Sequence, residues 1–343
     1  MGFEEGAEHM SGGAVAYHLR ENKAIERNLF IEVLARVARV ANVSDYTYVG
    51  FGGPFLEDFQ ALHSTLRISK MISIESDKNV CTRQAFNKPA AFIQIKNVTS
   101  GEFLRSHEFV DGNIVWLDYT APKDLYVQLS EFRSLVGKLG RFDVAKITLN
   151  ANPSALGGQS KGVALHEERR HELAKRLGDH CKFELNDDDV LPKNYPTTLL
   201  KAVRSCLGDL AARASGEYFQ PLSAFIYKDS GHQMLTVTGV ILNAKDDQDK
   251  ADFLGKSRID HWPFRNLHWS SPIEISVPAL SAKERLALDN ALPITDEVDA
   301  GDYLADQLGY CPSDQENIPT TKSLLANYAK FYRAYPLFSR VVL

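Results

Sequence analysis

A glycine-rich turn with few side chains directly follows a short apolar segment near the amino terminus. Residues 46–50 (YTYVG) have the composition of a strand, and residues 51–54 (FGGP) continue it as a turn. Glycine permits positive φ and close approach of the backbone to a ligand. The pattern PFLEDFQALHSTLR is helical, and we expect that helix to begin at Pro54, which a first turn tolerates. A strand, a bare turn and a helix in this order predict a ligand site at the carboxyl edge of an α/β sheet.

Strand patterns alternate with helical patterns over the first half of the chain. A first helix is expected over residues 21–40, and further strands over residues 70–77, 91–99, 112–122 and 141–153. Two of these strands contain the nearly continuous apolar runs IVWL and VAKITL, which are typical of parallel strands buried on both faces. The alternation therefore favours a mostly parallel sheet with helices packed on it.

The end of this alternation separates two kinds of α/β sheet. Residues 222–242 contain two β-rich runs around KDSGHQ, which predicts a late antiparallel hairpin. A nicotinamide-binding Rossmann sheet ends in parallel strands, whereas a class I methyltransferase sheet ends in a reversed seventh strand paired with the sixth. The expected fold class is therefore α/β, with a Rossmann-like class I methyltransferase sheet that is mostly parallel and ends in an antiparallel hairpin.

The 343 residues divide by pattern into three parts. Residues 1–16 contain no apolar signal core and are expected to be a disordered leader or a tag. Residues 17–243 are expected to form the α/β domain together with its amino-terminal helix. Over residues 244–343 the pattern changes to aromatic loops and helices, one of which opens with the capping-box sequence SAKE. We expect this last part to be a mainly helical appendage.

Composition limits the partners and the compartment. A formal net charge of −5 argues against a broadly basic surface, so a nucleic-acid partner is compatible with a local patch but is not favoured. The four cysteines are scattered without metal-ligand or disulfide spacing, which favours a reducing cytoplasm. The longest apolar runs, such as MLTVTGVIL, are too short to cross a bilayer. No membrane association is expected, whereas assembly as a homo-oligomer or as a subunit of a complex stays open.

Glycines and polar side chains follow the first four expected strands. The expected cofactor-binding set is Gly50, Phe51, Gly52, Gly53, Glu75, Ser76, Asn97 and Asp118. Glu75 lies 75 − 50 = 25 positions after Gly50, near the roughly 20 expected for a carboxylate that accepts hydrogen bonds from both ribose hydroxyls. Asn97 is expected to bond the adenine edge. Together with the terminal hairpin, this order favours S-adenosylmethionine, whereas a nicotinamide dinucleotide site requires a third glycine where Phe55 stands.

Several segments of the first half also resemble a known family. The runs YHLRENKAIERNLFIEVL, YVGFGGPFLEDFQALH, MISIESD, RQAFNKP and IVWLDYTAP are similar to a bacterial family described as putative O-methyltransferases. The resemblance covers roughly residues 17–158, and SIE and WLDY are its more specific parts. It implies a class I methyltransferase fold with Gly50, Gly52, Glu75 and Asp118 on the cofactor side.

The methyl acceptor is less defined than the cofactor. Asp118 and Tyr119 are the expected catalytic residues, because they follow the fourth strand beside the cofactor set. The acid and the aromatic residue match part of an amine-methylating signature, but its proline pair is absent, which makes an exocyclic amine acceptor less favoured without excluding it. The family resemblance implies an O-directed acceptor. Asn150 at the end of the fifth strand, with Arg20 and Lys23 at the start of the first helix, are the expected substrate-binding residues.

Other motifs in the chain bear on metal binding and on two alternative functions. His166 and His171 in HEERRH lie five positions apart, not four as a zinc helix requires, and the acids of NDDDV point apart, so no metal site is expected. One alternative is a nucleic-acid methyltransferase that stacks bases on the aromatic residues of the appendage. Another is a non-catalytic subunit of methyltransferase fold, because Tyr48 and Pro54 depart from the usual glycine motif.

Overall fold

The computed structural model describes residues 20–110, 112–208, 216–229, 231–243, 247–294, 298–312 and 318–336. The expected leader of residues 1–16 therefore lies outside the described residues. The strands are β1 (Thr47–Gly50), β2 (Lys70–Glu75), β3 (Ile93–Asn97), β4 (Asn113–Asp118), β5 (Val144–Asn150), β6 (Glu217–Asp229), β7 (His232–Asn243) and β8 (Ile273–Ile275). The helices are α1 (Glu21–Val37), α2 (Glu57–Leu66), α3 (Lys78–Asn87), α4 (Ser100–Ser106), α5 (Leu125–Lys138), α6 (Val163–Leu177), α7 (Tyr195–Leu207), α8 (Asp247–Ser257), α9 (Ala282–Asn290), α10 (Ala300–Leu308) and α11 (Ile318–Phe331).

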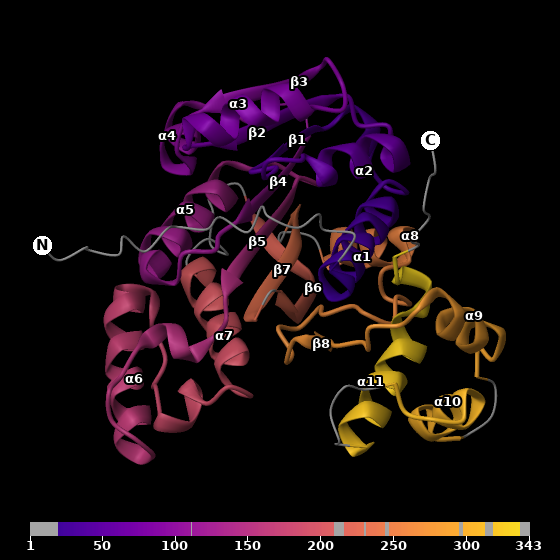
Figure 1. Ribbon diagram of the computed structural model, residues 1–343. Coiled ribbons are helices and arrows are strands. Elements are labelled where there is room, and N and C mark those ends of the chain that lie inside the picture. Colours follow the sequence, from indigo (N-terminus) through magenta and orange to yellow (C-terminus); the bar gives the residue numbers. More distant parts are fainter. Residues whose placement is uncertain are drawn as a thin grey trace, which may run out of the picture.

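One twisted sheet of eight described strands organises the molecule, in the order β3-β2-β1-β4-β5-β7-β6-β8 (Figure 1). Strands β1 to β5 run parallel, and β7 runs antiparallel to both β5 and β6. The hairpin closes between Asp229 and His232, as KDSGHQ predicts. The expected parallel sheet with a terminal antiparallel hairpin is confirmed. The short strand β8, which pairs parallel with β6 at the sheet edge, was not expected from the sequence.

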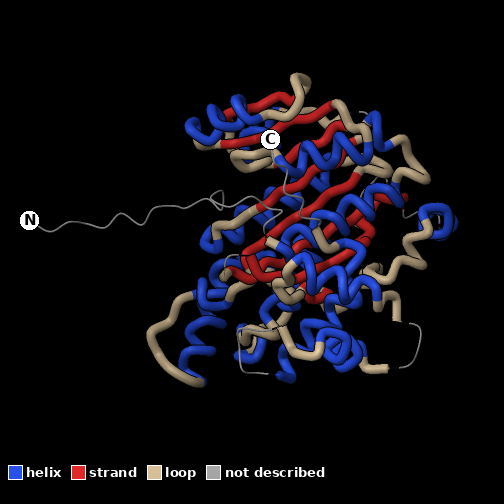
Figure 2. The backbone as a smooth tube through the Cα atoms, turned by 45° about the vertical axis from the view of Figure 1, so that its right-hand side comes forward, coloured by secondary structure: helices blue, strands red, loops and turns tan. Residues whose placement is uncertain are grey.

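Helices cover both faces of the sheet, and a hydrophobic cluster lies under each layer (Figure 2). The first cluster joins α1 and α2 to residues of the carboxyl-terminal region, including Phe253, Trp262, Leu288 and Tyr328. The second cluster lies under α4, α5, α6 and α7. Burial of this apolar surface is the main driving force for packing the layers. Because the carboxyl-terminal region shares its cluster with α1, its helices and α1 are packed as one layer.

The aromatic residues of the carboxyl-terminal region belong mostly to this core. Trp262, Phe264 and Phe331 are buried, and the rings of Phe264 and Phe331 stack with centroids 5.0 Å apart. The alternative of base stacking on the appendage depends on exposed rings, because a base needs an open aromatic face. Burial of these three rings removes part of the set on which that alternative was based, whereas Trp269 and Tyr332 are half-buried.

The turn after β1 differs from the expectation in one respect. Helix α2 begins at Glu57, and Pro54 lies in the preceding turn, so the expected helix start at Pro54 was wrong. Leu56 precedes the helix with a left-handed φ of 54° and a fully buried side chain. This conformation reverses the chain direction between the turn and the helix, and burial of the leucine in the core offsets its backbone cost.

Candidate functional site

A cavity of about 520 Å³ opens at the carboxyl ends of β1, β2, β3 and β4. Its size falls within the range of sites for small-molecule ligands and cofactors. Its lining residues are Lys23, Phe51, Gly53, Pro54, Ile74, Glu75, Ser76, Val80, Val98, Thr99, Ser100, Asp118, Tyr119, Thr120, Ala121, Asp124, Val127, Gln128 and Glu131. The cavity thus occupies the edge where an open α/β sheet binds its ligands.

The glycine-rich turn contributes unequally to the cavity wall. Phe51 and Gly53 line it, whereas Gly50 and Gly52 are not among the lining residues. Gly52 has a φ of +71°, and a Cβ atom there would lie 2.5 Å from Leu56 Cδ2 and 2.8 Å from Ser73 Oγ. Those separations are shorter than any normal contact, so Gly52 allows α2 and β2 to pack closely behind the turn.

A buried glutamine holds the turn in shape. The Nε2 group of Gln84 donates to the carbonyl oxygens of Phe51 and Gly53, each at 2.9 Å. The hydroxyl of Ser73 also donates to the Phe51 carbonyl, at 3.1 Å. The two carbonyl groups are therefore satisfied by the protein before any ligand arrives, which makes the turn a preformed part of the wall.

The β2 end supplies a carboxylate. Glu75 lines the cavity, and its Oε1 atom accepts a hydrogen bond of 2.8 Å from the backbone N–H of Asp77. Burial raises the pKa of Glu75 above its ordinary value, and the backbone N–H groups that bond its charged form oppose this shift. Ser76 also lines the cavity. Asn97 is not a lining residue, because its side chain donates to the carbonyl oxygens of Glu75 and Ser76, each at 2.9 Å.

The β4 end supplies Asp118 and Tyr119. Both line the cavity, and the Tyr119 hydroxyl donates a short hydrogen bond to the carboxylate of Glu131. The same carboxylate accepts a 2.7 Å bond from Ser100 Oγ. Burial, and then the neighbouring Glu131, raise the pKa of Tyr119 well above its ordinary value. The phenol therefore stays protonated at neutral pH and acts as a donor, not as a proton acceptor.

The expected substrate residues are distributed differently. Lys23 is nearly buried on α1 and reaches the cavity, whereas Arg20 and Asn150 are not lining residues. The Oδ1 atom of Asn150 accepts from the backbone N–H of Asn152 at 3.0 Å, which shapes the chain after β5. Of the three, the structure brings only Lys23 to the cavity.

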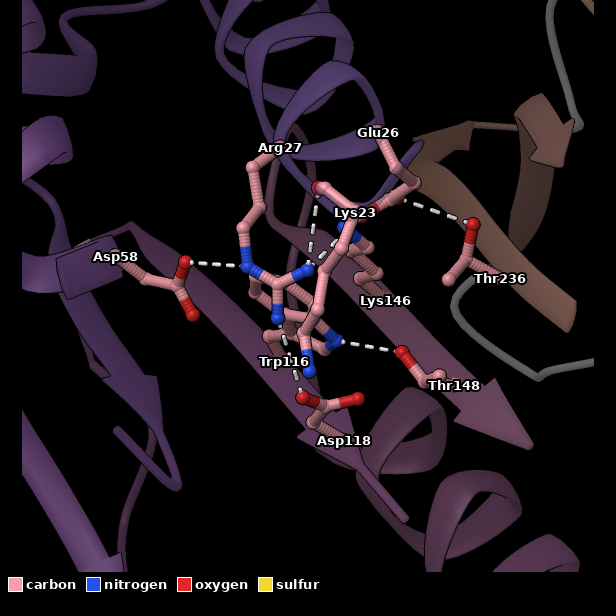
Figure 3. Close-up of polar contacts among 9 residues, drawn as sticks. All are labelled: Lys23, Glu26, Arg27, Asp58, Trp116, Asp118, Lys146, Thr148 and Thr236. Carbon is pink, nitrogen blue, oxygen red and sulfur yellow. Dashed lines mark hydrogen bonds and ion pairs between the residues drawn. The ribbon is translucent and has the colours of Figure 1, made fainter. Parts of the chain in front are cut away.

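Asp118 and the charged side chains behind it form a largely buried set that we call the α1 charge cluster (Figure 3). Its members are Lys23, Glu26, Arg27, Asp58, Asp118 and Lys146. Arg27 Nε lies 2.8 Å from Asp58 Oδ1, and Arg27 Nη2 lies 3.5 Å from Asp118 Oδ2. Burial raises the pKa of Asp58, and the nearby Arg27 opposes that shift. Charged groups this far from solvent are tolerated when they are paired.

Lys146 forms the deepest part of this cluster. It lies in the middle of β5 with no exposed surface, and its Nζ atom is 2.7 Å from Glu26 Oε1. The same oxygen accepts a 3.0 Å hydrogen bond from Thr236 on β7. The ammonium group lies 3.5 Å from the centroid of the Trp116 ring, close enough for a cation–π interaction. Burial lowers the pKa of Lys146, and the attraction of Glu26 opposes this effect.

Sequence reasoning missed several residues around the cavity. They are Glu26, Arg27, Asp58, Gln84, Ser100, Glu131 and Lys146. One signal was present, because Lys146 interrupts the apolar run VAKITL, and a lysine in a buried strand implies a buried partner. Its partner Glu26 lies 146 − 26 = 120 positions away, on the helical face that otherwise reads as apolar.

The described part of the chain offers neither a metal site nor a membrane-spanning helix. It contains no group of three or more histidine, cysteine or acidic residues able to hold a metal ion. In the same part, every helix falls short of the length and apolar character needed to span a bilayer.

The lining side chains suit an adenosyl cofactor with an amino-acid end. Glu75 offers a carboxylate that can accept from a ribose diol, and the adjoining turn presents Gly53 and the apolar Phe51 ring. Lys23 and Asp118 place a positive and a negative side chain on the wall formed by α1 and β4. S-adenosylmethionine carries a carboxylate, an ammonium group and a ribose, so the donor and acceptor set fits it.

Comparisons with known proteins extend this observation. The sequence matches the family described as "Putative O-methyltransferase" over residues 15–343. Among solved structures, the N-methyltransferase NodS from Bradyrhizobium japonicum WM9 is similar over 63% of this chain and 96% of its own, at 10% identity and a TM-score of 0.35. The plantazolicin methyltransferase BpumL, solved in complex with SAH, is similar over 65% of this chain and 87% of its own, at 9% identity and a TM-score of 0.39. The search of curated proteins found no match.

The family assignment follows from the match to the family model. The match covers almost the whole chain, and the family is the one that the sequence segments resemble. The chain belongs to the family described as "Putative O-methyltransferase", and its fold is a Rossmann-like α/β sheet that ends in an antiparallel hairpin.

Proposed function

We propose that this protein transfers a methyl group from S-adenosylmethionine to a hydroxyl acceptor at the cavity over β1, β2 and β4. The observation that carries the proposal is the position of Glu75, a partly buried carboxylate at the end of β2 that faces the cavity beside the glycine-rich turn. A carboxylate there can accept hydrogen bonds from both hydroxyls of a ribose. The turn, preformed by Gln84, provides the adjoining wall without further ordering.

The amino-acid end of the cofactor is assigned to the opposite wall. Lys23 is positioned to bind its carboxylate, and Asp118 is positioned to bind its ammonium group. Charge-assisted hydrogen bonds of this kind are roughly twice as strong as neutral ones. In this assignment Phe51, Gly53 and Ser76 line the middle of the site, while Gly50 and Gly52 shape the turn from behind.

The chemistry of the step divides between the cofactor and the protein. When bound, S-adenosylmethionine supplies a methyl group activated by a sulfonium. The protein aligns the acceptor and excludes water. A hydroxyl acceptor also needs a group that takes its proton, and in this assignment Asp118 is not that group, because its carboxylate pairs with Arg27 and with the ammonium group of the cofactor. Tyr119 is proposed to orient the acceptor or the wall as a hydrogen-bond donor, because its phenol stays protonated.

The cellular location of the protein is also part of the proposal. The four cysteines are free thiols, which supports a reducing bacterial cytoplasm as the location.

Calorimetric titration with S-adenosylhomocysteine, the demethylated product, tests the proposal directly. We expect one binding site per chain in the wild type and binding weakened at least about tenfold in Glu75→Gln, the loss expected for hydrogen bonds to a charged group. Glu108→Gln, at an exposed carboxylate away from the cavity, is the matched control and should bind as the wild type does. Absence of binding to the wild type, or equal binding by Glu75→Gln, would contradict the assignment.

A further inference from the structure

Arg27 lies among three carboxylates, those of Glu26, Asp58 and Asp118, and beside an aromatic ring. It projects from α1 with 8% of its side chain exposed, and its Nε group bonds Asp58 on α2 at 2.8 Å. Its Nη2 group lies 3.5 Å from Asp118 on β4, and its guanidinium carbon lies 4.9 Å from the centroid of Trp116. One side chain therefore connects three elements of the fold beside the cavity (Figure 3).

The contacts of Arg27 fix its orientation. A guanidinium group is planar and presents its donors in a rigid fork, so a bond to Asp58 through Nε also sets the direction of both Nη groups. The Nη1 group is held in addition by the backbone carbonyl of Lys23, at 3.4 Å. With the Trp116 ring close to the same group, little freedom remains for Nη2, which faces Asp118.

Stability alone gives a weak reason for this arrangement. Buried ion pairs often contribute little net stability, because desolvation offsets the attraction between the charges. Arg27 lies within ion-pair distance of three carboxylates, those of Glu26, Asp58 and Asp118, and Asp118 is the one that also lines the cavity. Figure 3 shows the Lys23 side chain reaching beside Arg27 towards Asp118. At the cavity end of the α1 charge cluster, the Asp118 carboxylate therefore pairs with Arg27 on one side and faces the cavity on the other.

We infer that Arg27, held by Asp58, is a positioning residue that fixes the Asp118 carboxylate for the ammonium group at the amino-acid end of the cofactor. This inference rests on the proposed function of the cavity. Arg27 itself touches no reacting atom in this account. It acts by restricting one oxygen of Asp118, so that the carboxylate does not need to be ordered when the ligand binds.

A pair of ligands separates positioning from simple folding. S-adenosylhomocysteine has the amino-acid end, whereas 5′-methylthioadenosine has the same adenosine and sulfur but no carboxylate or ammonium group. Calorimetric titration of both ligands gives a ratio of affinities for each variant. A residue that only supports the fold changes both affinities together, whereas a residue that positions Asp118 changes the ratio.

We expect Arg27→Gln to weaken binding of S-adenosylhomocysteine at least about tenfold and to leave binding of 5′-methylthioadenosine within about threefold of the wild type. Arg27→Lys keeps the positive charge, and therefore the net charge of the α1 charge cluster, but it lacks the planar guanidinium group that can bond two carboxylates at once. We therefore expect the ratio of the two affinities to change in the same direction but by a smaller factor. Arg36→Gln, on the same helix and bonded to Glu32 and the carbonyl of Arg258, is the control and should leave both affinities unchanged.

Folding is controlled by a second variant. The double variant Arg27→Gln with Asp58→Asn removes both members of the buried pair, so it leaves no uncompensated charge at that position, and it is expected to show the same lowered ratio. Equal weakening of both ligands in these variants, or an unchanged ratio in Arg27→Lys and the double variant, would overturn the inference. Absence of binding of either ligand to the wild type would instead overturn the proposed function.

Discussion

The two walls of the cavity are built in different ways. The β2 wall depends on local contacts, since the side chain of Glu75 bonds the backbone two residues later and its loop is bonded by Asn97, 22 residues later. The α1 wall depends on distant ones, because Arg27 pairs with Asp58 across 31 positions and Glu26 accepts from Thr236 across 210. The β2 wall is partly open to solvent, whereas Glu26 and Lys146 are buried. Removal of a charge should therefore affect mainly ligand binding at the β2 wall, whereas at the α1 wall removal of the buried charges of Glu26 or Lys146 should also affect folding.

The largest effect is expected at the centre of the α1 charge cluster. Lys146→Met leaves the carboxylate of Glu26 buried with the hydrogen bond from Thr236 and a longer ion pair with Arg27 at 3.9 Å. Loss of one member of a buried pair costs about 3–5 kcal/mol. We expect the free energy of unfolding, measured with urea, to fall by that amount.

A double variant and a surface control complete this experiment. Glu26→Met combined with Lys146→Met removes both charges and should recover most of the loss, since a buried pair can be replaced by apolar groups at little cost. Lys256→Gln breaks an exposed pair with Asp252 and should leave the unfolding curve unchanged. A single variant as stable as the wild type would mean that the α1 wall does not depend on its buried charges.

The next effect concerns the packing behind the β2 wall. Gly52→Ala forces a left-handed residue to carry a Cβ atom 2.5 Å from Leu56 and 2.8 Å from Ser73. We expect the free energy of unfolding to fall by about 2–4 kcal/mol, from backbone strain together with overpacking.

Gly140 is a suitable control for this substitution, because a Cβ atom there would meet nothing within 4 Å. Gly140→Ala should change the free energy of unfolding by less than about 1 kcal/mol. If Gly52→Ala were as mild as Gly140→Ala, the turn would be freer than the structure describes, and its role as a preformed wall would be lost.

The pH dependence of ligand binding should test the role of Glu75 in the β2 wall. Its raised pKa means that burial disfavours the ionised form, so Glu75 favours folding most below its ordinary pKa of 4.5, and this contribution is lost as the pH rises through the raised value. Ligand binding has the opposite sign, because the ribose hydroxyls need the charged carboxylate as acceptor.

We therefore expect affinity for S-adenosylhomocysteine to fall as the pH is lowered from 7 towards the raised pKa, beginning above pH 4.5. The loss should reach about 1.5–3 kcal/mol, the usual range for hydrogen bonds to a charged group. Calorimetry between pH 7 and pH 5 measures it, with Glu75→Gln as the variant whose affinity should vary less. A profile that is the same in the wild type and in Glu75→Gln would assign the titration to another group.

The smallest effect is expected at Tyr119. Tyr119→Phe removes the hydrogen bond to Glu131 but leaves that carboxylate its bond from Ser100, so we expect the free energy of unfolding to fall by about 1 kcal/mol. Affinity for S-adenosylhomocysteine should stay within about threefold of the wild type. A larger loss of affinity would show that the phenol contacts the cofactor directly.

Sequence reasoning succeeded where structure is set by local pattern. Alternating apolar and helical segments predicted the parallel sheet, and the residues around KDSGHQ predicted the hairpin of β6 and β7. Residues that directly follow strands were placed at the cavity for the same reason, since strand ends of a parallel sheet share one edge. Phe51, Gly53, Glu75, Ser76 and Asp118 are examples.

Reasoning from pattern failed where a side chain's partner is remote in the sequence. Glu26 and Arg27 lie in a helix whose apolar spacing indicates one buried face, and nothing local shows that their partners come from β5, α2 and β4. The start of α2 was missed because Leu56 adopts a left-handed conformation that the sequence does not signal. Asn97 and Asn150 follow strands as expected, but each bonds nearby backbone atoms, and neither lines the cavity.

A crystal structure of the protein in complex with S-adenosylhomocysteine tests the central claim most directly. The account predicts both ribose hydroxyls within hydrogen-bonding distance of the Glu75 carboxylate, and the ammonium group on Asp118 with the carboxylate on Lys23. A ligand bound away from the β1 and β2 ends, or one whose amino-acid end lies on Glu75, would contradict it.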